Sequence, residues 1–534
     1  MQLVAYGAQD VYLSGNPQIT FFKVVYRRHT NFSVEPIQQT WNGAADFGRT
    51  VTCNINRNGD LISNMYVAVK LSAQNQSGIS WGYVNRLGHA MIESVKIEIG
   101  GSKIDEQYGD WLNIWYELTH KAGQVRGYAK MIGDVPELTT VSQGPKNAYQ
   151  MYIPLQFWFN RNNGLALPLI ALQYHDVRVT LKFRDASACV NYGGVEAPSL
   201  TNLMADSYLL IDYVYLDSEE RKRFAQASHE YLIEQLQFTG SESLTSSSNK
   251  YRLNFNHPSK YLVWAPHLER YVARSEYIAY AFNGDWNAAR DRFAKVLVAA
   301  TGTKSVSNEL SWTGLTTSTV GDLITPPLPA TGILSRVEVK FVAKDTNARV
   351  DFSTPEALLE NAVVTRNDLT MEDISMTITG LLTAVPSTFS STILRTFAIN
   401  VVNYHNYGNF IDGTDNPVIS SKLQLNGHDR FQARDGHYFN YVQPAQHFSN
   451  TPADGINVYS FALRAEDHQP TGTCNFSRID NATLQVDCGL YNATSTTYAN
   501  QYIGSNSTSI VNIYTVNYNV LRVMSGMAGT AYSN

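Results

Sequence analysis

The residues best suited to chemistry are four histidines in the C-terminal part of the chain, each with a carboxylate nearby in sequence. They are His428, His437, His447 and His468, with Asp429, Asp435 and Asp467. Imidazole and carboxylate groups bind transition metals, so a metal site inside a β-sandwich has to be considered. However, no His-x-His pair is followed by a glutamate, and the histidines fall in different turn-like contexts. The pattern favours histidines that serve turns or interfaces.

Motifs for other chemistry are missing from the sequence. There is no Gly-x-Ser-x-Gly motif, no phosphate-binding loop, and no Gly-x-Gly-x-x-Gly followed by a suitable helix. The Asp and Glu residues are scattered, and no spacing pairs them as a general acid and a general base. We therefore expect no catalytic residues, no metal and no cofactor, and a protein that is not an enzyme.

Composition suggests a protein that makes many contacts with other proteins. The chain has 534 residues, enough for two domains, and is only 16% charged, with 32 tyrosines. Its net charge of −5 gives no electrostatic basis for direct nucleic-acid binding. Cys53, Cys189, Cys474 and Cys488 are spaced neither as a zinc site nor as a disulfide framework, so we expect buried thiols in a reducing compartment.

The sequence carries no signal for export or membrane insertion. The N-terminus lacks a basic and an apolar region, and no apolar run approaches the ~20 residues of a membrane span. We expect a soluble protein that is made and used in the cytoplasm. Without a signal peptide, ordinary host glycosylation is not expected at the sequons. These sequons are at Asn31, Asn75, Asn475, Asn481, Asn492 and Asn506.

Alternating apolar and polar residues predict an all-β fold made of many short strands. The clearest pattern is residues 177–183, where Val177, Val179, Leu181 and Phe183 share one face. Residues 61–71, 95–99, 209–215, 251–255, 483–488 and 514–520 show the same period of two. One short helix is expected after Asp110, which could cap it, and its apolar stripe would close one end of a sheet sandwich. The stripe is Trp111, Ile114, Trp115 and Leu118.

The longest helical signal marks a joint between two domains. Asp217 can cap a helix and Glu220 can complete a capping box, after which a strand pattern begins near Tyr231. We therefore expect an N-terminal domain over residues 1–216, a connector helix over 217–230, and a C-terminal domain over 231–534. Residues 267–415 have no counterpart in the first half, and we expect them to form a surface insertion with β structure of its own.

The two halves resemble each other. Lys-Ile-Glu-Ile-Gly-Gly at 96–101 is echoed by Lys-Leu-Gln-Leu-Asn-Gly at 422–427. Shortly after each comes an aromatic segment, Gly-Asp-Trp-Leu-Asn at 109–113 and Gly-His-Tyr-Phe-Asn at 436–440. Because a strand, a glycine turn and an aromatic segment recur in the same order, we infer a duplicated domain.

Four blocks of the sequence resemble the major capsid proteins of nucleocytoplasmic large DNA viruses, a double jelly-roll family. The blocks include Phe21, Phe22, Tyr26 and Arg28 near the N-terminus, Phe224 and Tyr231 in the joint, His257, Pro258 and Trp264, and finally Asn475, Phe476, Arg478 and Asp480. The matches run from residue 3 to Gly526 and exclude the insertion. The resemblance implies two eight-stranded jelly rolls in tandem, joined by a short helix.

The resemblance also implies a function. Three chains would form a pseudo-hexagonal capsomer, a homotrimer, that tiles an icosahedral virion shell assembled in the host cytoplasm. Partners would be neighbouring capsomers, minor capsid or cement proteins and, indirectly, an internal membrane. A host-attachment or glycan-binding jelly-roll protein of the virion surface is the alternative, and a cupin-like enzyme is disfavoured by the missing ligand pattern.

The matching residues then receive structural roles. We expect Phe476 to anchor the core and Arg478 to pair with a carboxylate such as Asp480. We expect Phe224 and Tyr231 to be buried against the flanking jelly rolls. The insertion would lie on the outward face of the capsomer, and the arm up to Gly15 would face the shell interior.

Overall fold

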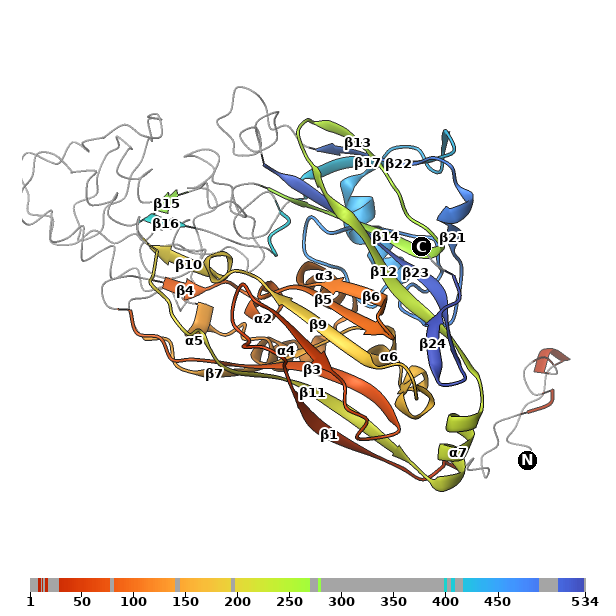
Figure 1. Cartoon of the computed structure of the whole chain (residues 1–534). Coiled ribbons are helices and arrows are strands. Elements are labelled where there is room, and N and C mark those ends of the chain that lie inside the picture. The colour runs from red at the N-terminus through yellow and green to blue at the C-terminus, as the bar shows by residue number, and fades with distance from the viewer. Residues whose placement is uncertain are drawn as a thin grey trace, which may run out of the picture.

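The computed structural model describes most of the chain, including both β-sandwiches (Figure 1). The described residues are 8–10, 12, 15–17, 28–76, 81–139, 145–193, 197–268, 277–279, 398–400, 405–408, 416–488 and 508–532. Most of the expected insertion and most of the N-terminal arm lie outside these ranges. The predictions for where those two segments face therefore fall outside the described residues.

The N-terminal half folds into a jelly roll of two antiparallel four-strand sheets. One sheet has the order β1 (Phe32–Thr40), β11 (Met204–Leu216), β3 (Leu61–Leu71) and β7 (Tyr149–Pro154), with β8 (Leu167–Pro168) beside β3. The other has the order β2 (Thr50–Asn54), β9 (Val177–Phe183), β5 (Ile92–Ile99) and β6 (Ser102–Tyr108). Strand β9 alternates buried and more exposed residues as its sequence predicts.

The C-terminal half repeats this topology strand for strand. One sheet has the order β12 (His229–Ser243), β23 (Ile510–Met524), β14 (Pro258–His267) and β20 (Asn457–Ser460), with β21 (Cys474–Asn475) beside β14 and β24 (Met527–Thr530) beside β23. The other has the order β13 (Ser248–Arg252), β22 (Ala482–Cys488), β17 (Val418–Leu425) and β18 (His428–Asp429), with β19 (Arg434–Asp435) on β17. The prediction of two eight-stranded jelly rolls is confirmed.

The glycines of the two repeated segments show that the duplication extends to backbone conformation. The turns after β5 and β17 place Gly100 and Gly101, and Asn426 and Gly427, at positive φ angles between 50° and 82°. Each aromatic segment then begins at a glycine, Gly109 or Gly436, where a Cβ atom would overlap the carbonyl oxygen of the first residues of β5 or β17. Only glycine fits such an approach.

Short helices connect these strands within the described ranges. They are α2 (Leu87–Ala90), α3 (Gly109–Thr119), α4 (Val125–Met131), α5 (Pro136–Thr139), α6 (Trp158–Arg161), α7 (Ser218–Gln226), the π-helix η6 (Tyr438–Val442) and α13 (Gln443–His447). None of the helices in the described part of the chain has the length and apolarity to cross a membrane. A further small sheet has the order β15 (Tyr277–Ala279), β16 (Ala398–Asn400), β10 (Val190–Gly193) and β4 (Trp81–Tyr83), so the insertion pairs with the N-terminal half.

The expectations for the two helices need correction. Asp110 does not cap α3, because the N-cap residue is Tyr108 and Asp110 lies inside the first turn. The connector α7 ends at Gln226, earlier than residue 230, and Asp217 caps it by accepting a 2.9 Å hydrogen bond from the Glu220 amide. The apolar stripe of α3 also does not close its own sandwich, since it packs against the other jelly roll.

Candidate functional site

The residues proposed for chemistry are not gathered into one site. His437 contacts Asp435 at 2.6 Å, His447 bonds to the Leu463 carbonyl oxygen, and His468 faces Glu234. In the described ranges no group of three or more His, Cys, Asp or Glu side chains is placed to hold a metal ion. All four cysteines are free thiols, and burial raises the pKa of Cys53 to about 11 and that of Cys488 to about 12.

Many side chains interact at the interface between the two jelly rolls, which is here called the seam. Its apolar part is the stripe of α3, which packs on the outer face of the C-terminal sheet. The Trp111 ring lies 6.4 Å from the ring of Tyr261 and 5.6 Å from that of Tyr514. Each buried aromatic ring removes 150–250 Å² from water, so these contacts favour one fixed arrangement of the domains.

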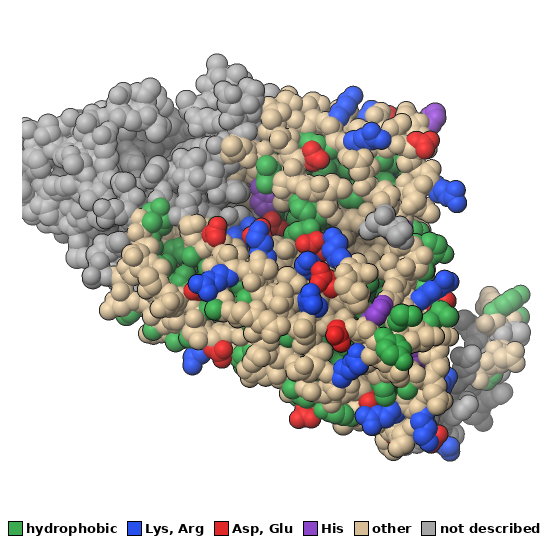
Figure 2. All heavy atoms as spheres, in the orientation of Figure 1, with side chains coloured by type: hydrophobic (Ala, Val, Ile, Leu, Met, Phe, Trp, Pro, Cys, Tyr) green, Lys and Arg blue, Asp and Glu red, His purple; other side chains and the backbone are tan. Residues whose placement is uncertain are grey.

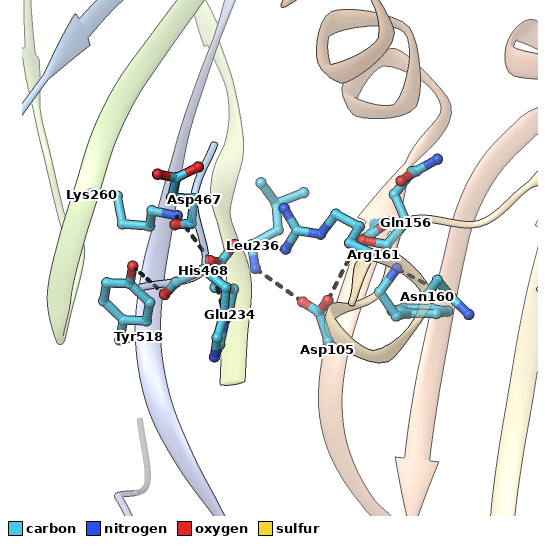
Figure 3. A network of polar contacts seen from close by, with 12 residues as sticks. Asp105, Gln156, Asn160, Arg161, Glu234, Leu236, Lys260, Asp467, His468 and Tyr518 are labelled. Carbon is cyan, nitrogen blue, oxygen red and sulfur yellow. Dashed lines mark hydrogen bonds and ion pairs between the residues drawn. The ribbon is translucent and has the colours of Figure 1, made fainter. Parts of the chain in front are cut away.

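A buried ion-pair network forms the polar part of the seam (Figure 3). Glu234 of β12 is 4% exposed and lies 2.8 Å from both Lys260 of β14 and Arg161 of α6. Burial raises the pKa of the Glu234 carboxyl, but Arg161, His468 and Lys260 together outweigh it and hold that pKa at about 2. Arg161 also stacks over the Trp115 ring at 4.6 Å. Because Arg161 and Glu234 belong to different jelly rolls, this pair joins the two domains.

Asp105 of β6 is the second buried carboxyl group of the seam, and it behaves in the opposite way. Its Oδ1 accepts a 3.0 Å hydrogen bond from the Leu236 amide of β12, and its Oδ2 accepts one from Gln107. Burial raises the pKa of Asp105 to about 7, because these hydrogen bonds and the more distant Arg161 only partly offset the loss of water.

The C-terminal hairpin of β23 and β24 completes the core of the N-terminal jelly roll. Ile233, Leu521, Val523 and Ala528 belong to the same buried cluster as the N-terminal strands. The Tyr174 amide donates a 2.9 Å hydrogen bond to the Gly526 carbonyl oxygen, and His175 bonds to the backbone of Ala528. Side chains from the C-terminal half of the sequence therefore form part of the core of the N-terminal jelly roll.

The connector is fixed to the N-terminal jelly roll by a buried carboxylate. Asp60 is 2% exposed and accepts hydrogen bonds from the Leu216 amide at 2.9 Å and from the Arg221 guanidinium at 2.8 Å. Phe224 and Tyr231, which we expected to be buried, are both half-buried, and each ring stacks near His229. The expectation was too strong, because α7 lies on the molecular surface with no fully buried residue.

Two of the sequence blocks meet in space although more than 200 residues separate them. The His257 amide donates a 2.8 Å hydrogen bond to Ser477, and Pro258 pairs with Asn475 between β14 and β21. Phe476 is 3% exposed and packs edge-on against Phe255 and Phe461.

The remaining predicted residues have simpler positions. Trp264 is fully buried against Phe439, whereas Arg28, Arg478 and Asp480 are exposed. Within the described residues no ion pair joins Arg478 to Asp480 or to another carboxylate, so the structure gives the expected pairing no support. Phe21, Phe22 and Tyr26 lie outside the described residues.

Sequence reasoning missed the seam residues Asp105 and Arg161, and it missed Asp60, which holds the connector helix. The available signal was a charged residue inside an apolar strand, as with Glu234 in Tyr-Leu-Ile-Glu-Gln-Leu and Lys260 in Ser-Lys-Tyr-Leu-Val-Trp. A charge in such a place needs a buried partner, although the sequence does not say which one.

Comparison with known proteins settles the family. Residues 20–217 match the family described as major capsid protein N-terminus, and residues 220–529 match the large eukaryotic DNA virus major capsid protein family. The chain belongs to the major capsid protein family of large eukaryotic DNA viruses. It is a structural capsid protein, and the comparisons do not support the host-attachment or glycan-binding alternative.

Similar capsid proteins span the whole length of the chain. Capsid protein 1 of Acanthamoeba polyphaga mimivirus is 42% identical, and the major capsid protein of Phaeocystis pouchetii virus is 43% identical, each covering 100% of this chain and 99% of its own. A chain of the PBCV-1 virus capsid is 33% identical with a TM-score of 0.60, covering 96% of this chain and 100% of its own. The Faustovirus major capsid protein, at 12% identity and a TM-score of 0.59, covers 97% of this chain and 94% of its own and shares the fold.

Proposed function

We propose that this capsid protein assembles as a homotrimer whose jelly rolls form a pseudo-hexagonal capsomer, and that such capsomers tile an icosahedral shell. The observation that carries the proposal is the pair of duplicated jelly rolls held at one fixed orientation by the seam. Three chains with two similar domains each present six similar sides, as hexagonal packing requires. An obligate interface of this kind should bury more than ~2,000 Å².

The proposal extends to partners and place. The protein acts in the virion shell, is assembled in the host cytoplasm, and contacts minor capsid or cement proteins. Its contact with an internal membrane is indirect. Charges of both signs are interspersed on the face shown in Figure 2, which supports a role without direct nucleic-acid binding. We propose no catalytic role for the protein.

Light scattering after size exclusion, together with negative-stain microscopy, tests the assembly. The expected result is a trimer with a hexagonal outline. A protein that remains a monomer or a dimer at micromolar concentration would contradict it.

A further inference from the structure

The duplication creates two equivalent sheet faces, and the described part of the chain covers one of them with a helix of the other jelly roll. The outer face of the sheet β12-β23-β14-β20, here called the covered face, receives the stripe of α3. At the centre of this face, β14 and β23 place an aromatic residue opposite an aliphatic one in two positions. Tyr261 is opposite Val516, and Val263 is opposite Tyr514. All four residues of this centre are at most 6% exposed.

The outer face of the equivalent N-terminal sheet, here called the open face, carries the same pattern. Strands β3 and β11 pair Tyr66 with Leu210 and Ala68 with Tyr208. In the topology of the two jelly rolls these strands occupy the places of β14 and β23. Tyr66, Tyr208 and Leu210 are only half-buried, and Val34 of the neighbouring strand β1 is 52% exposed.

No described element packs on the open face as α3 packs on the covered face. The sheet lies along the lower edge of the molecule in Figure 1, on the side away from the C-terminal jelly roll. Aromatic and aliphatic side chains in such a position are typical of a protein interface, because most monomers expose only small apolar patches.

The chain also contains an equivalent of α3, the helix η6–α13, which covers no sheet of the other jelly roll among the described residues. Gly109 and Gly436 begin the two helices, and Asn113 and Asn440 are both buried four residues later. This alignment places Tyr438 at the position of Trp111 and Val442 at the position of Trp115. Tyr438 is half-buried, Val442 is 40% exposed, and Ala445, at the place of Leu118, is exposed.

We propose that the open face of one copy receives the helix η6–α13 of a second copy, in the way that the covered face receives α3 within one chain. Tyr438 would then lie against Tyr66 and Tyr208 of the neighbouring copy. Asp206 and Asp212 lie on the open face, on the same side of β11 as Tyr208 and Leu210. Arg434, whose guanidinium lies 5.9 Å from the centre of the Tyr438 ring, would bring a positive charge to these carboxylates in the same pairing.

This inference rests on the proposed trimer, and it specifies which surfaces form it. The contact is head-to-tail, because each copy uses its N-terminal sheet on one side and its C-terminal helix on the other. Head-to-tail contacts close into rings when the rotation permits. Three chains would then form a ring of six jelly rolls. Around this ring, contacts within one chain would alternate with contacts between two chains, and in each contact a helix of one jelly roll would cover the outer sheet face of the next.

Substitutions on the two surfaces test the pairing in the full-length protein. Val442→Glu and Tyr66→Lys are each expected to reduce the trimer fraction at least tenfold at micromolar concentration, because each places a charge in the apolar contact. Ile419→Glu is the matched control, since Ile419 is 53% exposed on β17 of the other sheet. It should leave the trimer fraction unchanged.

The possible outcomes separate this inference from the proposed function. If the wild type is a trimer and both variants are trimers to the same extent, the assigned surfaces are wrong, but the proposed trimer is still supported. A wild-type monomer overturns both. Thermal unfolding of each variant within about 2 °C of the wild type shows that loss of the trimer reflects the interface and not misfolding. If a variant unfolds more than about 2 °C below the wild type, the milder substitution at the same residue, Val442→Ser or Tyr66→Ser, is used in its place. An unchanged trimer fraction in these milder variants would also overturn the assigned surfaces.

Discussion

Two buried carboxyl groups on one seam have opposite pKa shifts, and the reason lies in their neighbours. Glu234 faces two cations at 2.8 Å, so its charged form is favoured in spite of burial. Asp105 accepts hydrogen bonds from amide groups and has no cation in direct contact among the described residues, so burial dominates. A capsid protein can thus hold an ionised pair and a protonatable acid within one interface.

The Asp105→Asn variant should alter how stability depends on pH. The folded-state pKa of about 7 lies above the unfolded value of 3.8, so the folded chain keeps a proton that the unfolded chain releases. This contribution is complete below pH 4 and is lost as the pH rises through 7, at about 1.4 kcal/mol per pH unit. Asparagine removes that loss, so the variant should gain stability relative to wild type between pH 5 and 7.5.

Thermal unfolding across this pH range measures the difference between Asp105→Asn and wild type. Asp176→Asn is the control, because the Asp176 side chain is 86% exposed. A constant difference for Asp105→Asn over the whole range would contradict the raised pKa.

Phe476→Ala should cost about 3–5 kcal/mol of unfolding free energy, because the ring is buried against two other rings. Leu463→Ala, at a site 73% exposed, should cost less than about 0.5 kcal/mol. Chemical denaturation of both variants provides the measurement. An unchanged melting temperature and a normal trimer yield for Phe476→Ala would show that the ring is not an anchor.

Sequence alternation indicates strands but does not say how many of their faces are covered. Strands β9 and β23 both alternate in sequence, yet β9 exposes one face while most of β23 is buried on both. Thr515, Asn517 and Asn519 are polar and at most 4% exposed, and Asn519 bonds to Gln235. Such polar positions resemble a solvent face in sequence, because a hydrogen-bonded asparagine tolerates burial.

The connector helix should depend on Arg221 and not on its neighbour Lys222. Among the described residues, Arg221→Ala leaves the buried Asp60 carboxylate with one hydrogen-bond donor, the Leu216 amide at 2.9 Å, which should cost about 2 kcal/mol. Among the described residues, the ion-pair partner of Lys222 is Glu219, at 3.5 Å and exposed, so Lys222→Ala should have little effect. Hydrogen exchange over residues 216–228 should accelerate in Arg221→Ala alone, and equal exchange in both variants would refute this role for Asp60.

Over the whole molecule, the two jelly rolls share their cores. The N-terminal core includes Ile233, Leu521, Val523 and Ala528, and the C-terminal sheet depends on the stripe of α3. The duplicated domain is therefore a repeat in topology but not an independent folding unit.

A fragment of residues 1–216 should consequently expose a large apolar surface. The α3 stripe would be uncovered, and its Trp111 and Trp115 side chains alone bury about 300–500 Å². With Ile114 and Leu118 added, the stripe reaches the size of the largest apolar patches on typical monomers, about 300–600 Å². We expect the fragment to aggregate and to bind a hydrophobic dye strongly. The same fragment with Ile114→Lys and Leu118→Lys should bind less dye, whereas a soluble wild-type fragment with no dye binding would contradict the shared core.

The sequence by itself determined the strand pattern, the connector and its Asp217 cap, the duplication and the family. These follow from local periodicity, capping chemistry and recurring motifs, which need no knowledge of the rest of the fold. Only the tertiary structure decided that the α3 stripe covers the other jelly roll, that Asp60 holds Arg221, and that Glu234 joins Arg161 across the seam. Burial and charge pairing depend on residues far apart in the chain, and a linear pattern does not record which surfaces meet.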